Sequence, residues 1–192
     1  AAAHAAVRSA VRVTTCCRSA LSCCCSCATC CCHCAAAVRS AAAQSADADL
    51  AKTHIHRHAP AANEVAIDIE YCGVCHSDLH TARDDWGGTK YPCVPGHEIV
   101  GRVVAVGDNV SRFKPGQRVG VGCMVDSCQS CSSCDDGLEQ YCENGMTGTY
   151  NGSLADGGYT FGGYSKHIVV REEFVLSIAD TLDPAAAAPL LC

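Results

Sequence analysis

Four cysteines within one short stretch constrain this 192-residue chain more than any other feature. Two residues separate Cys128 from Cys131 and Cys131 from Cys134, and seven residues lie between Cys134 and Cys142. Such a loop can place four thiolates around one tetrahedral zinc ion, at Zn–S distances of about 2.3 Å. Two disulfides are the alternative, and they require an oxidising compartment. Because no export signal is recognisable, the spacing favours zinc.

Hydropathy and charge argue against two classes of partner. No apolar run approaches the roughly 18–20 residues that a membrane span requires, so we expect a cytoplasmic protein that is not inserted in a membrane. The net charge is −6, but residues 1–46 carry four of the 14 basic residues and no acidic one. The remainder therefore holds ten bases against 20 acids. So acidic a segment is a poor ligand for nucleic acid.

Residues 1–42 differ in composition from the rest. Ten of the 19 cysteines lie between Cys16 and Cys34, and the segment shows no hydrophobic periodicity. Three interpretations stand: an organellar transit peptide, a thiol-rich metal buffer, and an upstream stretch wrongly included by gene calling. The missing initiator Met and the narrow residue alphabet favour the third. The expected division is a low-complexity leader over 1–42 and a folded domain over 43–192.

The rest of the chain has the texture of a β protein. Residues 64–71 alternate between apolar and polar side chains, as a half-buried strand does. Further strands are expected at 99–106, 117–122, 165–170 and 174–178. Helical patterns are confined to 77–83 and to the segment from Pro184 onward. The predicted fold is mainly β with short helices, in the form of an irregular β-barrel or a sandwich.

A second set of potential metal ligands is dispersed along the sequence. A catalytic zinc keeps three protein ligands and one open position. Cys75, His97 and Cys192 are candidates for those three ligands. For each residue alone there is a simpler interpretation: a small buried cysteine, or a hydrogen-bonded histidine.

Several segments together resemble one family. They are CGVCHSDLH at 72–80, GHEIVGRVVAVG at 96–107, the four-cysteine loop with GLEQYC, and APLLC at the end. This set is similar to the zinc-dependent medium-chain alcohol dehydrogenases, specifically the cinnamyl alcohol dehydrogenase group. The resemblance implies a GroES-like β-barrel catalytic domain, with this chain ending before the Rossmann domain that binds NADP.

The resemblance also implies roles for individual residues. Catalytic zinc would be held by Cys75, His97 and Cys192, and structural zinc by Cys128, Cys131, Cys134 and Cys142. Glu98 would lie beside the catalytic metal, and Asp78 would orient His97. Ser77 would bind the substrate oxygen and begin a proton relay that passes through the cofactor ribose to His80. His76 would lie near the cofactor.

The implied function is that of an enzyme that interconverts primary alcohols and aldehydes with NADP(H). Its partners would be a small alcohol or aldehyde and, in the full-length protein, a second copy in a homodimer. No G-x-G-x-x-G fingerprint with the required strand and helix is found in the 192 residues, so we expect the chain alone to be inactive. A zinc-binding or metal-buffering protein without catalysis is the alternative.

Other candidate residues have simpler explanations. Three cysteines are interpreted as small core residues: Cys72, Cys93 and Cys123. Three histidines at alternate positions would share one strand face, as metal ligands or, more simply, as solvated side chains: His54, His56 and His58. Trp86 and Tyr91 are suited equally to a substrate pocket wall and to simple packing.

Overall fold

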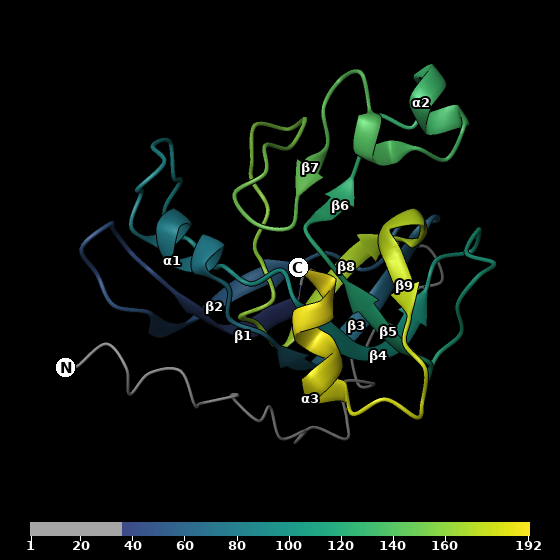
Figure 1. The fold of residues 1–192 in the computed structure, drawn as a ribbon, viewed down its shortest axis with the longest axis horizontal. Coiled ribbons are helices and arrows are strands. Elements are labelled where there is room, and N and C mark those ends of the chain that lie inside the picture. The colour runs from purple at the N-terminus through teal and green to yellow at the C-terminus, as the bar shows by residue number, and fades with distance from the viewer. Residues whose placement is uncertain (1–35) are drawn as a thin grey trace, which may run out of the picture.

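The structure is a computed structural model, and it describes residues 36–192. Its centre is a five-stranded antiparallel sheet with the order β8-β3-β4-β5-β9, curled into an open half-barrel (Figure 1). The strands are β3 (Glu64–Cys72), β4 (Ile99–Val106), β5 (Arg118–Val121), β8 (His167–Arg171) and β9 (Val175–Ser177). The expected strands and the mainly β fold with short helices are thus confirmed.

Alternation along β3 explains how this sheet forms its core. Val65, Ile67 and Ile69 are buried, whereas Asp68 between them is exposed. Because side chains of a strand alternate between faces, these three apolar residues of β3 reach the same interior. They pack there with the inward residues of the neighbouring strands and with Phe113 and Phe174.

A hairpin of two strands precedes the sheet. Strand β1 (Ala36–Ala42) pairs with β2 (Ala51–Arg57), and a bridge from Ser40 to Ser165 joins the hairpin to the segment before β8. Regular structure thus already covers residues 36–42, before the boundary expected after residue 42. An alanine-rich strand carries almost no apolar–polar alternation, which is why its sequence gave no strand signal.

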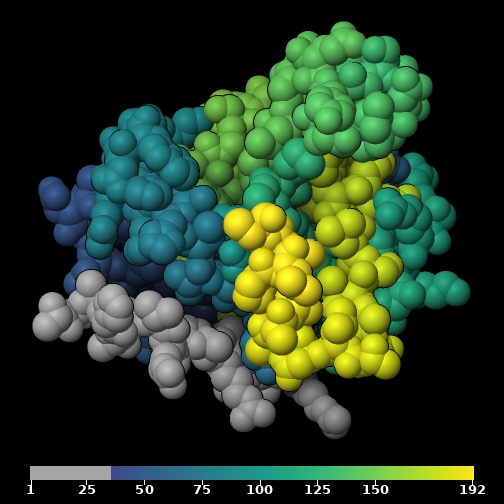
Figure 2. Space-filling view, in the orientation of Figure 1, coloured from purple at the N-terminus to yellow at the C-terminus, as the bar shows by residue number. Residues whose placement is uncertain are grey.

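The four-cysteine loop leaves the barrel through another hairpin. Strands β6 (Met124–Asp126) and β7 (Thr147–Gly148) pair at its base. Between them lie the short helices α2 (Ser132–Asp135) and η2 (Glu139–Tyr141). The loop projects from the barrel as a separate lobe, at the upper right in Figures 1 and 2. Such a small lobe has little apolar interior of its own.

Two short helical segments position residues of the candidate site. One follows β3, and the other ends at the residue before Cys192. Helix α1 (His76–Ala82) follows β3, and the 3-10 turn η3 (Glu172–Phe174) joins β8 to β9. Helix α3 (Pro184–Ala187) begins after the N-cap Asp183, whose carboxylate accepts two backbone N–H bonds, and continues into η4 (Ala188–Leu191). The buried Ala187 and Ala188 pack with Val100 of the sheet. This packing fixes the position of Cys192, which follows η4.

Two further expectations concern the leader and a possible membrane span. The ten cysteines between Cys16 and Cys34, and the three interpretations of the leader, lie outside the described residues. Within residues 36–192, no helix has the length and apolar character needed to cross a membrane.

Candidate metal centres

The predicted catalytic ligands come together from three distant parts of the chain. One ligand atom from each of Cys75, His97, Glu98 and Cys192 lies within 4.8 Å of the others. Cys75 is the N-cap of α1, His97 and Glu98 directly precede β4, and Cys192 follows η4. His97 and Glu98 are buried, while Cys192 is exposed. The cluster therefore has a closed inner side and an open side.

The separation of the two thiols, and the easier ionisation of Cys75, suit a metal site. The Sγ atoms of Cys75 and Cys192 lie 3.7 Å apart, close to the roughly 3.8 Å between sulfur ligands of tetrahedral zinc with 2.3 Å bonds. Hydrogen bonds from Ser77 lower the pKa of Cys75, and hydrogen bonding to Cys75 raises the pKa of Cys192 to about 11. A thiol that ionises easily beside an imidazole and an open position matches the donor set of catalytic zinc.

Asp78 lies directly behind His97. Its Oδ1 is 3.3 Å from His97 Nδ1, and the side chains of His97 and Asp78 are only 5% and 2% exposed. Burial opposes ionisation of Asp78, but hydrogen bonds from His97 and from two backbone N–H groups outweigh it and lower the pKa. A carboxylate on Nδ1 leaves Nε2 of the ring available to bind a metal. The structure thus gives Asp78 the place that orienting His97 requires.

The relay candidates lie at the rim of this cluster. The Ser77 hydroxyl is 3.5 Å from Cys75 Sγ. His80 contacts Asp85 through Nδ1 at 2.9 Å and stacks near Trp86, with 5.0 Å between ring centroids. His76 is exposed, with its ring 6.5 Å from that of His80. No hydrogen bond recorded for the described residues joins Ser77 to His80, so a relay between them needs an intervening group.

The four cysteines of the loop form the second cluster. Their Sγ atoms all lie within 4.8 Å of one another, with 3.5 Å from Cys131 to Cys134 and 3.9 Å from Cys128 to Cys134. These separations again match sulfur ligands around one tetrahedral ion and exceed the roughly 2.05 Å of a disulfide bond. The described cysteines, including all four, are free. This donor set fits a closed zinc site.

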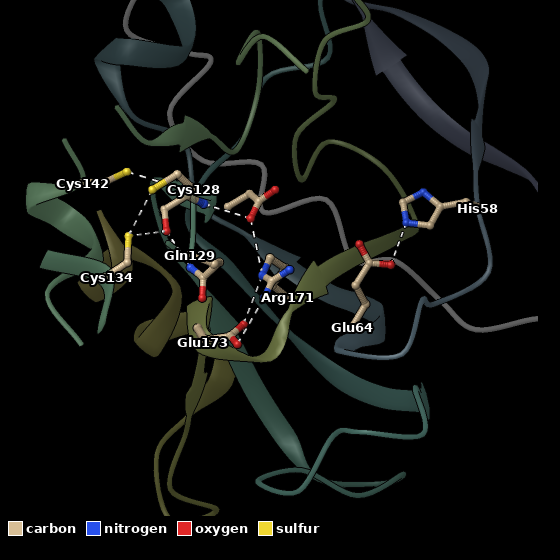
Figure 3. Close-up of polar contacts among 10 residues, drawn as sticks. His58, Glu64, Cys128, Gln129, Cys134, Cys142, Arg171 and Glu173 are labelled. Atoms are coloured by element: carbon tan, nitrogen blue, oxygen red, sulfur yellow. Dashed lines mark hydrogen bonds and ion pairs between the residues drawn. The ribbon is translucent and has the colours of Figure 1, made fainter. Parts of the chain in front are cut away.

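Polar groups around the loop favour thiolates and tie the lobe to the barrel. Hydrogen bonds from Asn144 and Ser130 lower the pKa of Cys128 to about 5. The hydroxyl of Ser127 lies 3.2 Å from Cys134 Sγ and accepts a hydrogen bond from Gln129 (Figure 3). Arg171 of β8 then pairs with Asp126, the residue before Ser127, at 3.4 Å. The lobe is thus connected to the sheet by an ion pair near its four cysteines.

The remaining candidate residues differ in how far the structure buries them. Cys93 is fully buried and Cys72 partly buried, but Cys123 is exposed, so its interpretation as a core residue was wrong. Cys123 follows the end of β5 on a bend, where sequence position alone does not indicate which way a side chain points. The histidines at 54, 56 and 58 are exposed, and none belongs to either ligand cluster of the described residues. Trp86 is exposed, and Tyr91 donates a hydrogen bond to Ala82.

Sequence reasoning missed two aromatic residues at the catalytic cluster. Tyr150 lies beside His97, with 5.6 Å between ring centroids. Tyr164 donates a hydrogen bond of 3.0 Å to Asp78 Oδ2. A weak signal exists for Tyr164 in the Gly162-Gly163 pair that precedes it, because adjacent glycines mark a close backbone approach.

Curled strands, short helices and two clusters of potential metal ligands are together typical of a GroES-like barrel. A family model, the alcohol dehydrogenase GroES-like domain, matches residues 61–180. The chain belongs to this family, which confirms the resemblance drawn from its motifs.

Known proteins place the chain within the family. An aldehyde reductase of Escherichia coli, YahK, is 57% identical over 157 residues, and the NADP-dependent alcohol dehydrogenase C of Mycobacterium bovis is 54% identical over 155. Each match covers 81% of this chain and 45% of the relative. The chain therefore spans less than half the length of the curated relatives it matches.

Solved structures give the same result. A cinnamyl alcohol dehydrogenase from Sorghum bicolor aligns with a TM-score of 0.78 and 41% identity over 82% of this chain and 45% of its own. The cinnamyl alcohol dehydrogenase from Helicobacter pylori, solved with NADP(H), gives a TM-score of 0.78 and 40% identity over 82% and 46%.

Proposed function

We propose that this chain supplies the metal-binding catalytic domain of a zinc-dependent alcohol dehydrogenase that interconverts primary alcohols and aldehydes with NADP(H). One observation carries the proposal. Cys75, His97 and Cys192 come together in an open-sided cluster, and four other cysteines form a separate, closed cluster. One open and one closed set of ligands is the combination expected of a catalytic and a structural zinc. The family membership and the NADP-dependent relatives support the same activity.

The proposed domain includes the β1–β2 hairpin, because this hairpin packs with the barrel. Val38 and Ile55 from the two strands form one buried cluster with Val94. Arg57 at the end of β2 donates hydrogen bonds to the carbonyls of Phe161 and His167, which precede and begin β8. Removing the hairpin would expose this cluster and leave those carbonyls without their donor.

In this mechanism a bound zinc ion would act as a Lewis acid, and bound NADP(H) would exchange hydride with the substrate. Cys75, His97 and Cys192 would hold the zinc, and Glu98 would lie beside them as a further carboxylate donor. Asp78 holds the His97 ring through Nδ1. These residues fix the position of the substrate oxygen at the open side of the cluster.

Proton movement is assigned to residues at the rim. The Ser77 hydroxyl, beside Cys75, would take the proton of a substrate alcohol while it passes its own proton through an intervening group toward His80, and the reverse transfer would protonate the oxygen of a reduced aldehyde. Asp85 holds Nδ1 of His80, which leaves Nε2 to exchange that proton with solvent. His76, exposed beside His80, is assigned to the cofactor side of the site.

We expect a chimera to reveal the activity. This chain would be joined to the part of Escherichia coli YahK that it does not match, which provides the missing length of a relative that is 57% identical. The expected result is about two zinc ions per chain and NADPH-dependent reduction of an aromatic or aliphatic aldehyde, followed by NADPH absorbance. The 192-residue chain alone should bind the zinc without reducing aldehydes. Less than about one zinc per chain would contradict the proposal.

Ser77→Ala in that chimera is expected to lower kcat by roughly 10²-fold, as loss of a positioned proton-transfer group does. Zinc content and melting temperature should stay at parental values, because the residue contributes no metal ligand. Ser111→Ala, at an exposed position outside both clusters, is the matched control. Full turnover in the Ser77 variant would remove this residue from the relay.

A further inference from the structure

Asp78 is a buried carboxylate with a donor at each of its acceptor positions. Oδ1 lies 2.9 Å from the N–H nitrogen of Gly96 and 3.3 Å from His97 Nδ1. Oδ2 lies 3.0 Å from the N–H nitrogen of Cys75 and 3.0 Å from the hydroxyl oxygen of Tyr164. Since a carboxylate offers about four lone-pair sites, this shell of partners fixes both its position and the plane of its oxygens.

Three of those donors belong to the ligand segments themselves, and the fourth does not. Cys75 and His97 are proposed ligands, and Gly96 is adjacent to His97. Tyr164 comes from the segment before β8, and its hydroxyl reaches Asp78 across 86 residues of sequence. It is therefore the contact through which the barrel wall holds the carboxylate.

The position of Tyr164 is itself closely determined. Its backbone N–H donates to the carbonyl of Pro95 at 2.9 Å, and its carbonyl accepts from Ala41 of β1 at 2.8 Å. Its ring packs against the buried cluster of Val38, Ile55 and Val94. A side chain held at both its backbone and its ring presents its hydroxyl at a defined point.

We propose that Tyr164 is a positioning residue of the catalytic metal centre, which acts by holding Asp78 and, through it, the His97 ring. The inference rests on the proposed function, since it assigns a metal to Cys75, His97 and Cys192. Loss of the hydroxyl leaves one lone pair of a buried carboxylate without a partner, so Asp78 and the His97 ring lose their fixed orientation. The four-cysteine site has no part in these contacts.

Tyr164→Phe tests this role in the full 192-residue chain, because the two metal sites can be distinguished in one protein. We expect a roughly 10-fold or greater loss of metal affinity at the catalytic cluster, measured by competition with a chromophoric chelator. The d–d absorption of Co²⁺ bound there should change shape, whereas the affinity of the four-cysteine site should stay the same. A parental circular dichroism spectrum and melting temperature would establish that the variant is folded.

Tyr159→Phe is the matched control, because its hydroxyl contacts the carbonyl of Pro92 at the surface and lies outside this shell. A second test places Tyr164→Phe in an Asp78→Asn background, where the tyrosine should have less effect than in the parent. Equal effects in both backgrounds, or parental affinity in the single variant, would overturn the inference alone. A parent chain that binds no second metal would overturn the proposed function together with it.

Discussion

Cys142→Ser is expected to lower the melting temperature of the chain by roughly 10 °C or more, equivalent to about 3–5 kcal/mol of unfolding free energy. The lobe between β6 and β7 contains only short helices, and Leu138, Tyr141 and Met146 on it are exposed. It has too little apolar burial to order itself, so the metal held by four thiolates must supply most of that free energy.

The measurement combines thermal unfolding, followed by circular dichroism, with elemental analysis. The zinc content should fall by about one ion per chain relative to the parent. Cys123→Ser is the matched control, because this cysteine is exposed and belongs to neither ligand cluster. Equal melting temperatures for the Cys142 variant and the parent would refute a structural role for the loop metal.

Gly96→Ala is expected to cost about 3 kcal/mol or more of stability and to remove metal from the catalytic cluster. Gly96 has a φ of +102°, and an added Cβ would lie 2.8 Å from the backbone nitrogen of Tyr164. The backbone cannot move away freely, because the Gly96 carbonyl accepts from Gly163 and its N–H donates to Asp78. Any shift of the Gly96 backbone therefore also displaces the adjacent His97.

Gly87→Ala separates backbone strain from collision. Gly87 has a similar left-handed φ of +77°, but nothing lies within 4 Å of an added Cβ. This variant should lose only about 1–2 kcal/mol and keep both metals. The comparison uses chemical unfolding and zinc analysis of both variants. Similar losses in the two would mean that the tight contact with Tyr164 has no energetic importance.

Local patterns in the sequence were enough for much of the fold. Alternation predicted β3 because a half-buried strand must repeat every two residues, and that rule needs no knowledge of distant partners. The four-cysteine loop was predictable for a similar reason, since its ligands lie within one short segment. Strand β1 was not predicted, because alanine and serine leave almost no alternation to detect.

The long-range contacts of the candidate site could not be found in this way. The bond from Tyr164 to Asp78 depends on how β8, the β1–β2 hairpin and the segment before β4 pack together. No spacing rule connects residues so far apart in the sequence. Residue types alone suggested Cys75, His97 and Cys192 as candidate ligands, and the comparison of motifs with a known family then implied that they form one site.

The two ligand clusters differ in the length of chain that must be synthesised before all of their ligands are present. Cys128 and Cys142 are 14 positions apart, whereas Cys75 and Cys192 are 117 apart. A nascent chain grows at roughly 5–20 residues per second, so several seconds separate completion of the first cluster from that of the second. The lobe can therefore take up its ion while Cys192 is still to be added, and the catalytic cluster must be filled later. On the ribosome, the closed site would fold around metal first and the open site would be loaded last.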